Sequence, residues 1–230
     1  MRRDPLTRRT GRSPAKITLV GRVGLAVAVA IGILVSVALQ TTAPVGVEIH
    51  NSQVVRDARQ DPIAPRVGST SANLTVVIFT DYRCPACRRS DADILETVKE
   101  DGRAVVIFRH SPIFGPRSVV AARTAIAAQW QGKFLQVHNA FMKAPGDLDS
   151  KNLMQATTTA GADWPRLQID LSRHSAEIDR LLARNAFTMS VLGLRGTPSY
   201  LVGNYLVEGA ITRWQLRQLF RDARASSSLG

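Results

Sequence analysis

The sequence predicts an α/β fold in which both ends of one domain contribute to a single sheet and a block of helices is inserted between them. An N-terminal transmembrane helix is predicted to precede this domain. Two apolar runs at 74–82 and 103–110 flank a helical pattern, amphipathic segments fill 116–193, and two short apolar runs follow before a last helix. A chain of 230 residues is long enough to bury such a core.

The N-terminal region is a basic tail followed by an apolar run. Residues 1–22 hold seven Arg and Lys against one Asp, so they supply +6 of the net charge of +12. Residues 23–39 carry no charge, and a bilayer-spanning helix needs about 17–25 residues. Basic flanks stay in the cytoplasm, so we predict a cytoplasmic tail at 1–22, a transmembrane anchor at 23–39 and an exported remainder. The alternative is a cleaved signal peptide, because Ser36-Val37-Ala38 is a small-x-small pattern.

The remaining charge does not indicate nucleic-acid binding. Half of the excess lies in the tail, where topology explains it, and the rest is not accompanied by a pattern of stacking aromatic residues along a basic groove. Residues 40–72 contain Pro44, Pro62, Pro65 and Gly68 without a sustained period. We therefore predict that 40–72 is a linker to a folded domain at 73–225.

The domain begins with a βαβ pattern. The run 74–82 is apolar and β-branched, as expected of a strand buried on both faces. A helical pattern follows Cys84, and Asp101-Gly102 indicates a turn. The apolar run 103–110 then predicts a second buried strand. This order favours a parallel pair of strands.

The segment 116–193 is predicted to be a helical insertion. Gly132 and the stretch 144–147 mark breaks between helices. Apolar residues that can line one buried side are Ile126, Trp130, Phe134, Val137 and Phe141. Further helices are expected at 150–160, 163–173 and 175–192. Two short strands around a Gly203-Asn204 turn and a helix from Thr212 to about Ala223 complete the domain.

Cys84 and Cys87 are the two cysteines of the chain, spaced as Cys-x-x-Cys. A structural zinc site needs four ligands, and the histidines His50, His110, His138 and His174 lack ligand spacing, so we predict no metal site. His110 and His138 are interpreted as structural residues. A fixed disulfide over so short a loop removes little chain entropy. A redox-active pair fits the spacing best, because exported thiols face an oxidising compartment.

A strand feeding a helix through this pair places Cys84 at the helix N-terminus, where unpaired N–H groups and the helix dipole stabilise a thiolate. Pro85 suits the first helical turn. Arg83, Arg88 and Arg89 add positive charge, so we expect a lowered pKa for Cys84 and a more buried Cys87 as resolving thiol. In a plainer interpretation, these arginines are neutralised on a solvated face by three acids, Asp81, Asp91 and Asp93.

The stretches "FTDYRCPACRRSDADI", "VVIFRHSPIFG", "AARTAIAAQWQGKFLQVHNAFM" and "LGLRGTPSYLVGNYLVEGA" resemble the DsbA-like branch of the thioredoxin superfamily. The resemblance covers about 62–223. It implies a thioredoxin fold with a helical insertion and thiol–disulfide oxidoreductase activity outside the cytoplasm, with no cofactor beyond the Cys84–Cys87 disulfide. It further implies that Cys84 is the exposed attacking cysteine, that Cys87 resolves, that Pro85-Ala86 is the active-site dipeptide, and that Thr197-Pro198 forms a substrate-binding cis-proline loop.

Two positions depart from the pattern of the family. Ile78 stands where thioredoxins often hold a buried acid, so proton transfer must use Asp81, water or a group that the sequence does not identify. The dipeptide Pro85-Ala86 lacks the histidine of the well-studied oxidase pattern, which removes one source of thiolate stabilisation.

Together these observations predict a thiol–disulfide oxidoreductase that is anchored in the bacterial inner membrane, with its catalytic domain in the periplasm. It is expected to function as a disulfide-forming oxidase. The alternatives are a reductase or isomerase of the same fold, or a non-enzymatic chaperone or metal-binding module. Expected partners are exported proteins with cysteines and a membrane redox partner, either a quinone-linked oxidase or a reductase. The short 40–72 region favours a monomer.

Overall fold

The computed structural model describes residues 19–42, 45–145 and 147–227. The chain divides into two compact units, Met1–Pro44 and Val45–Gly230. Each unit is described by itself.

The described part of the first unit is one helix, α1 (Leu19–Thr42), of 24 residues. The predicted anchor at 23–39 lies inside this helix, and residues 1–18 of the predicted basic tail lie outside the described part of the chain. Within the described residues, no helix combines the length and the apolarity that crossing a membrane requires. The anchor at 23–39 therefore stays a prediction.

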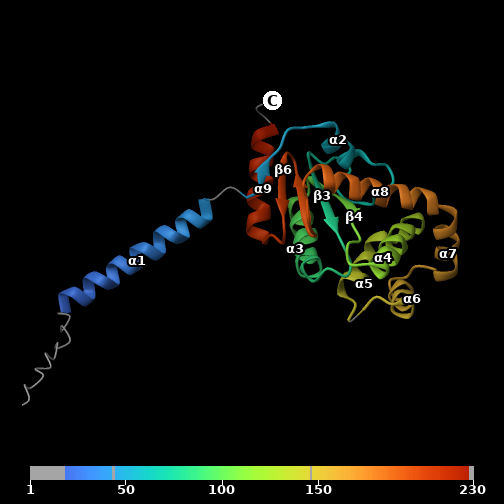
Figure 1. Ribbon diagram of the computed structural model, residues 1–230, viewed down its shortest axis with the longest axis horizontal. Helices are drawn as coiled ribbons and strands as arrows, with labels where there is room; N and C mark the ends of the chain where they lie inside the picture. The colour runs from blue at the N-terminus through green and yellow to red at the C-terminus, as the bar shows by residue number, and fades with distance from the viewer. Residues whose placement is uncertain (1–18, 43–44, 146, 228–230) are drawn as a thin grey trace, which may run out of the picture. The chain divides into compact units, whose positions relative to one another are not determined.

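The second unit is built on a six-stranded sheet with the strand order β1-β6-β5-β3-β4-β2 (Figure 1). The two central strands β3 and β4 run parallel, in register from Leu74 opposite Ala104 to Thr80 opposite His110. All other neighbouring strands are antiparallel. The strands are β1 (Val47–Glu48), β2 (Arg66–Gly68), β3 (Leu74–Thr80), β4 (Ala104–His110), β5 (Ser199–Val202) and β6 (Tyr205–Glu208).

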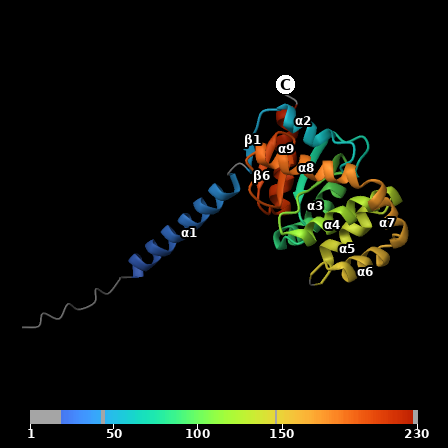
Figure 2. The ribbon, with the colours of Figure 1, turned by 45° about the vertical axis from the view of Figure 1, so that its right-hand side comes forward.

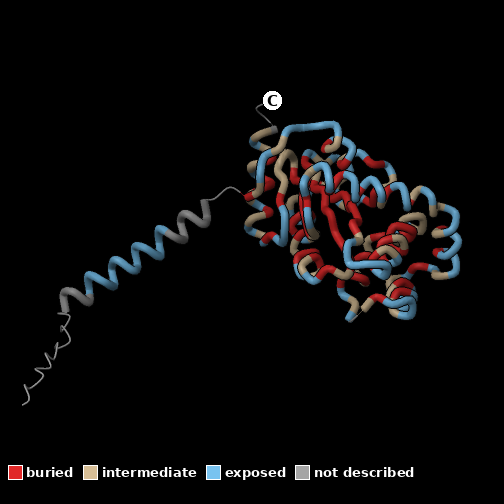
Figure 3. The backbone as a smooth tube through the Cα atoms, viewed as in Figure 1, coloured by how far each residue is buried: buried red, intermediate tan, exposed pale blue. Residues whose placement is uncertain are grey.

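The predicted βαβ unit is confirmed by β3, the helix α3 (Pro85–Asp101) and β4. Both strands consist largely of β-branched and aromatic residues and are buried along most of their length, as expected of strands covered on both faces. The buried strands lie at the centre of the unit in Figure 3. Gly102, with φ of 67°, ends α3 in the left-handed conformation that glycine adopts readily.

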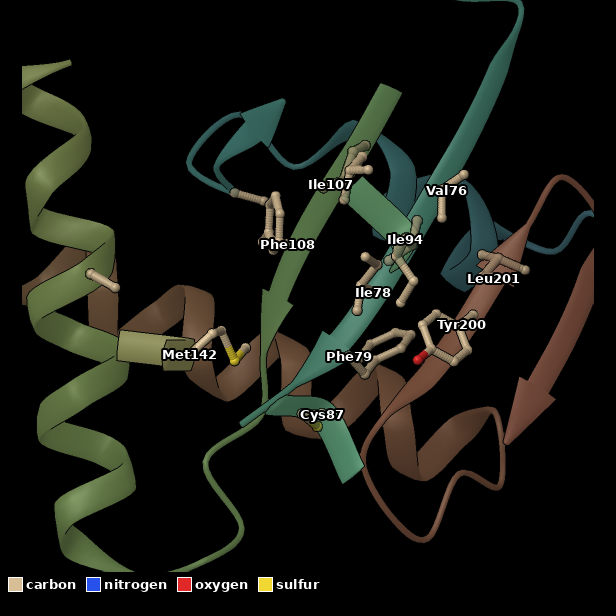
Figure 4. Close-up of a cluster of buried hydrophobic side chains, with 14 of the residues drawn as sticks. Val76, Ile78, Phe79, Cys87, Ile94, Ile107, Phe108, Met142, Tyr200 and Leu201 are labelled. Carbon is tan, nitrogen blue, oxygen red and sulfur yellow. The ribbon is translucent and has the colours of Figure 1, made fainter. Parts of the chain in front are cut away.

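Helices cover both faces of the sheet. The side chains of β4 alternate between them: Phe108 packs on Phe134, with ring centroids 5.0 Å apart, whereas Arg109 points to the opposite face. Figures 1 and 2 show α3 and the last helix α9 (Arg213–Ser227) on one face and α2 and α8 on the other. Figure 4 shows apolar side chains from the three adjacent strands β3, β4 and β5 meeting Ile94 of α3.

Between β4 and β5 lies the helical segment at 116–191. Breaks occur at both predicted places, with Gly132 at φ of 66° and a non-helical stretch after Lys143. The helices are α4 (Pro116–Ala127), the 3-10 helix η1 (Ala128–Gln131), α5 (Phe134–Lys143), α6 (Ser150–Thr159), α7 (Trp164–Arg173) and α8 (Ser175–Val191).

The structure differs from the sequence prediction at 40–72, where we expect a linker. From Val45 onward this segment belongs to the second unit and contributes β1, the helix α2 (Gln53–Gln60) and β2. The two strands have two and three residues, which is too short for a detectable alternation of polar and apolar side chains. Val55 and Ala58 of α2 are fully buried, so this helix is part of the core.

Asp61, which follows α2, anchors this segment through a buried ion cluster. Its Oδ2 lies 3.0 Å from Nη1 of Arg109 and 2.7 Å from Nε of Arg184 of α8, and its Oδ1 accepts a hydrogen bond from the Ile63 N–H at 3.0 Å. The Arg109 side chain is 1% exposed. Burial by itself raises the pKa of Asp61, but the hydrogen bonds from Arg184 and Ile63 and the charge of Arg109 outweigh it and lower the pKa below its ordinary value.

We predict that Asp61→Asn lowers the free energy of unfolding by about 3–5 kcal/mol at neutral pH, because Arg109 is left buried without a carboxylate. Because the native pKa of Asp61 is lowered, its stabilising effect is present above about pH 4 and is lost as the pH falls through the native pKa. The difference in the free energy of unfolding between Asp61→Asn and wild type should therefore become smaller at acidic pH. Denaturant unfolding at several pH values measures both effects.

The control is Asp57→Asn, which removes the same charge from an exposed position of α2 and should change stability by no more than about 0.5 kcal/mol. Equal effects of the two substitutions would contradict the role of Asp61.

Candidate active site

The two cysteines lie where β3 gives way to α3. Cys84 is the N-cap of α3, with φ of −76° and ψ of 117°, and Pro85 is the first helical residue. The Cys84 N–H donates to the Asp81 carbonyl at 3.1 Å, and its Sγ accepts from the Cys87 N–H at 3.4 Å. Both side chains are free thiols. The Cys84 sulfur thus caps one of the unpaired N–H groups of the first helical turn.

The Thr197-Pro198 loop lies directly against Cys84. The peptide bond between Thr197 and Pro198 is cis, and the Cys84 sulfur lies 3.1 Å from the Thr197 carbonyl oxygen. This contact joins residues 113 positions apart in the sequence. The pairing of β5 with β3, in which Ser199 lies opposite Phe79, fixes the loop at the end of the sheet where α3 begins.

The two thiols differ in their electrostatics. A hydrogen bond from the Cys87 thiol is the largest cause that lowers the pKa of Cys84, to about 5, against the opposing effect of burial. Thr197 and the N–H groups of Cys87 and Ala86 lower it further. The same thiol–thiol hydrogen bond, followed by burial, raises the pKa of Cys87 far above its ordinary value. At neutral pH the pair therefore holds one thiolate, on Cys84, and one thiol, on Cys87.

Exposure does not distinguish the two cysteines as the sequence led us to expect. Cys84 and Cys87 are each 2% exposed, whereas we predict an exposed Cys84 and a more buried Cys87. The Thr197 carbonyl contributes to this cover, since it lies in contact with the Cys84 sulfur. Hydrogen bonding, rather than accessibility, gives the two sulfurs different chemistry.

The arginines around the pair have structural partners. Nε of Arg83 lies 2.9 Å from Oδ1 of Asp147. Arg88 donates to the carbonyls of Phe141 and Met142 at 3.1 Å, so it caps the C-terminus of α5. Arg89 is exposed. The expected role of these arginines in lowering the Cys84 pKa is wrong, because its largest causes are hydrogen bonds within the site and not these charges.

Asp81, which the sequence offers as a proton acceptor, is a buried residue whose carboxylate connects two loops. One carboxylate oxygen accepts from the Arg83 N–H at 2.8 Å and the other from the Phe114 N–H at 3.1 Å. Ile78 occupies a buried position of β3 opposite Tyr200. Both oxygens of Asp81 are therefore used to hold two loops together.

A buried polar network lies beside α3. Oδ1 of Asp91 lies 2.9 Å from Nε2 of His138, Nδ1 of His138 lies 2.9 Å from the Tyr82 hydroxyl, and that hydroxyl lies 2.9 Å from Nε2 of His110. The two histidines are fully buried, and Asp91 is 7% exposed. Burial, and next the charge of His138, lowers the pKa of His110 to about 3, so this ring is neutral.

Sequence reasoning missed this network. From the sequence alone, Asp91 is placed with the acids of a solvated face, and His110 and His138 are interpreted as separate structural residues. One signal was present, since Asp91 lies four residues after Cys87 and therefore on the same face of α3. The contact with His138, 47 residues away, could not be seen without the fold. In the described part of the chain, no group of three or more His, Cys, Asp or Glu side chains is placed to hold a metal ion.

The comparison with known families identifies one match. The family described as Thioredoxin matches residues 60–222. A solved structure of a thioredoxin-like oxidoreductase from Silicibacter pomeroyi is 35% identical, with a TM-score of 0.71, and the match covers 74% of this chain and 98% of that one. The thiol-disulfide exchange protein alpha-DsbA2 from Wolbachia pipientis is 25% identical, with a TM-score of 0.69 and coverage of 73% and 90%.

The chain is also similar to curated proteins of two kinds. A probable disulfide bond formation protein D of Bacillus anthracis is 27% identical over 152 residues, 60% of this chain and 69% of that protein. Na(+)/H(+) antiporters NhaA 1 of Mycobacterium strains are 27% identical over 161 residues. This match covers 69% of the present chain but only 26% of the antiporters, so the chain matches about a quarter of their length.

We predict that the thiolate of Cys84 titrates with a pKa of about 5, and that Cys87→Ala raises this pKa by at least about one unit, because the largest stabilising hydrogen bond is lost. Ultraviolet absorbance of the thiolate against pH measures the titration. Cys87→Ser is the matched control, since its hydroxyl still donates, and it should retain more of the lowering than Cys87→Ala. An unchanged pKa in Cys87→Ala would contradict the assignment.

Proposed function

The chain belongs to the thioredoxin family, in its DsbA-like branch, and from this premise we propose that it is an extracytoplasmic enzyme that exchanges disulfides with exported proteins through Cys84 and Cys87. The observation that carries the proposal is the unequal pair at the start of α3: a stabilised Cys84 sulfur next to the Thr197 carbonyl, and a Cys87 thiol one turn further along the helix.

The proposed reaction needs no group beyond the two cysteines. In the oxidised enzyme, a substrate thiolate attacks the Cys84 sulfur of the Cys84–Cys87 disulfide. A Cys84–substrate disulfide forms, and Cys87 leaves as a thiolate that takes up a proton. A second substrate thiolate attacks the substrate sulfur of this mixed disulfide and releases the Cys84 thiolate. The substrate is then oxidised by two electrons and the enzyme holds the dithiol.

The lowered pKa of Cys84 supports the oxidase direction. Stabilising the thiolate stabilises the reduced form and makes the disulfide a stronger oxidant. This stabilisation comes from the Cys87 thiol, Thr197 and backbone N–H groups, and it does not depend on a histidine in the Pro85-Ala86 dipeptide. The relative from Bacillus anthracis is named as a probable disulfide bond formation protein, a name that agrees with the proposed direction.

The Thr197-Pro198 loop is proposed to receive the substrate chain. The Thr197 carbonyl oxygen lies 3.1 Å from the Cys84 sulfur, so a substrate peptide lying along this loop would place its own cysteine at the same sulfur. Pairing of an extended substrate with the loop backbone would give binding that is independent of substrate sequence.

We further propose that residues 23–39 anchor the enzyme at the bacterial inner membrane, with the catalytic unit in the periplasm. The sequence supports this: the run lies inside the 24-residue helix α1 and follows a basic flank. Large apolar side chains are exposed along α1, namely Val23, Leu25, Val27, Val29, Ile31, Ile33, Leu34 and Val35. Anchoring would raise the effective concentration of a quinone-linked oxidase or a reductase as redox partner.

We predict that the full-length protein, equilibrated with glutathione buffers, shows a reversible two-electron couple between about −180 mV and −120 mV, the range that separates isomerases from strong oxidants. A potential near the thioredoxin value of about −270 mV would contradict the oxidase and indicate a reductase. Cys84→Ala should abolish the couple. If wild type shows no couple, the redox proposal fails and a binding module takes its place.

We predict that the full-length protein stays in the membrane fraction after alkaline carbonate extraction. Ala30→Lys with Ile31→Lys should release it, because each lysine at the centre of a span costs about 2.5–3.5 kcal/mol. The control, Leu6→Lys with Thr7→Lys, adds the same charge outside the apolar run and should not release it. Release of the wild type, or a mature protein that begins after Ala38, would refute the anchor.

A further inference from the structure

A proton must enter or leave Cys87 at each exchange, and Asp81 is poorly placed to carry it. Both carboxylate oxygens of Asp81 accept backbone hydrogen bonds, at 2.8 and 3.1 Å. Ile78 has no group that can hold a proton. The raised pKa of Cys87 makes an acceptor necessary, because water alone removes the proton of such a thiol slowly.

Asp91 lies on the same face of α3 as Cys87, one helical turn further along. Side chains four residues apart on a helix have Cβ atoms about 5–6 Å apart. Ser90 lies between them in sequence, and its hydroxyl is 3.4 Å from the Cys87 carbonyl and 3.1 Å from the Tyr200 hydroxyl. Burial raises the pKa of Tyr200, and the charges of Cys87 and Asp91 raise it further, so both groups act on this one hydroxyl. Figure 4 shows Tyr200 and Cys87 within the same core cluster.

We propose that Asp91 accepts and returns the proton of Cys87 during thiol–disulfide exchange, and that His138 and Tyr82 are the positioning residues that hold its carboxylate in place. This inference rests on the proposed function, since it assigns a role within the same exchange reaction.

The proposed step balances in both directions. When Cys87 attacks the Cys84 sulfur of a mixed disulfide, its thiol proton passes to the Asp91 carboxylate, the Cys84–Cys87 bond forms, and the substrate thiolate leaves. When a substrate thiolate attacks the enzyme disulfide, Cys87 leaves as a thiolate and takes the proton back from Asp91. The distance of one helical turn suits transfer through one hydroxyl or water.

The hydrogen-bond network gives Asp91 a defined orientation. An ionised Asp91 accepts the Nε2–H of His138, so Nδ1 of His138 accepts the Tyr82 proton, and the Tyr82 oxygen accepts Nε2–H of His110. His110 is neutral and its Nδ1, within the described structure, has no hydrogen-bond partner. Each of the three hydrogen bonds from Asp91 to His110 thus has one donor and one acceptor, and the Nε2–H of His138 points to the Asp91 carboxylate.

Asp91 also has a route to solvent. It lines a hollow of about 170 Å³ together with the charged side chains of Arg88, Glu96 and Lys143. The titratable and charged groups that surround Asp91 and His138 are Cys87, Arg88 and Glu96 of α3, Lys143 of α5, Asp81 and Tyr82 of the β3–α3 loop, His110 of β4 and Tyr200 of β5. Asp91 is the carboxylate that joins the Cys87 face of α3 to this hollow.

The test uses the reduced full-length protein and the chromogenic disulfide 5,5′-dithiobis(2-nitrobenzoate). The first thionitrobenzoate is released when Cys84 attacks, and the second when Cys87 resolves the mixed disulfide. We expect Asp91→Asn to leave the first phase within about twofold of wild type and to slow the second at least about tenfold at neutral pH, since general bases contribute 10² or more. The second phase of Asp91→Asn should keep rising with pH, because hydroxide replaces the lost base.

Asp93→Asn is the matched control, because it removes the same charge from a partly exposed position of α3 whose carboxylate acts on Arg213. It should leave both phases within about twofold of wild type. Tyr82→Phe keeps the buried ring and removes the hydroxyl, and it should slow only the second phase, by less than Asp91→Asn. If wild type lacks the first phase, the proposed function fails; if Asp91→Asn keeps the wild-type second phase and pH profile, the present inference fails.

A measurement on wild type keeps the proposal testable if Asp91→Asn does not fold. The second phase of the wild type should be slowed more by D₂O than the first phase, because a proton moves from Cys87 to Asp91 only in the second phase. Equal solvent isotope effects on the two phases would overturn the proposal.

Discussion

The pairing of β5 with β3 is the constraint on which the site depends. It brings Thr197 to Cys84 across 113 residues of sequence, and it does so from a strand that follows the whole helical insertion. The helices from α4 to α8 must therefore leave the sheet after β4 and return the chain to the far side of β3. Without this pairing, Cys84 would keep its helix N-terminus but lose the carbonyl and side chain of Thr197.

Within that frame, short-range hydrogen bonds differentiate two chemically identical thiols. Cys84 receives hydrogen bonds from the first turn of α3 and from the Cys87 thiol, whereas Cys87 keeps its proton as the donor and its thiolate form gains no comparable stabilisation. The arginines that dominate the local sequence hold the surroundings instead. Arg88 ties α3 to the end of α5, and Arg83 ties the β3–α3 loop to Asp147. The charged side chains of the segment hold neighbouring elements together, and the reactivity of Cys84 comes first from the Cys87 thiol and then from Thr197 and the backbone N–H groups of Cys87 and Ala86.

Much of the fold could be predicted because its elements carry strong local patterns. The strands β3 and β4 are continuous apolar runs, and each helix from α3 to α8 is bounded by a glycine, proline or capping residue near the predicted place. The segment from β1 to β2 carries no such pattern, since edge strands of two or three residues obtain their structure from the strand they pair with. The Asp91–His138–Tyr82–His110 network could not be predicted for a related reason. None of the four residues has a distinctive local pattern, and they come into contact only when α3, α5 and β4 pack together.

The strand order also has a consequence for how the protein acquires its structure. In the sheet, β5 lies beside the central strand β3, yet it begins at Ser199, late in the chain. A polypeptide that emerges N-terminus first presents β3, both cysteines and the helical insertion well before the strand that covers them. During that interval the thiols are open to small oxidants and to cysteines of neighbouring chains. Contacts of such long sequence separation form slowly, so the newly made chain passes through a stage in which its two thiols are not yet covered by the Thr197-Pro198 loop.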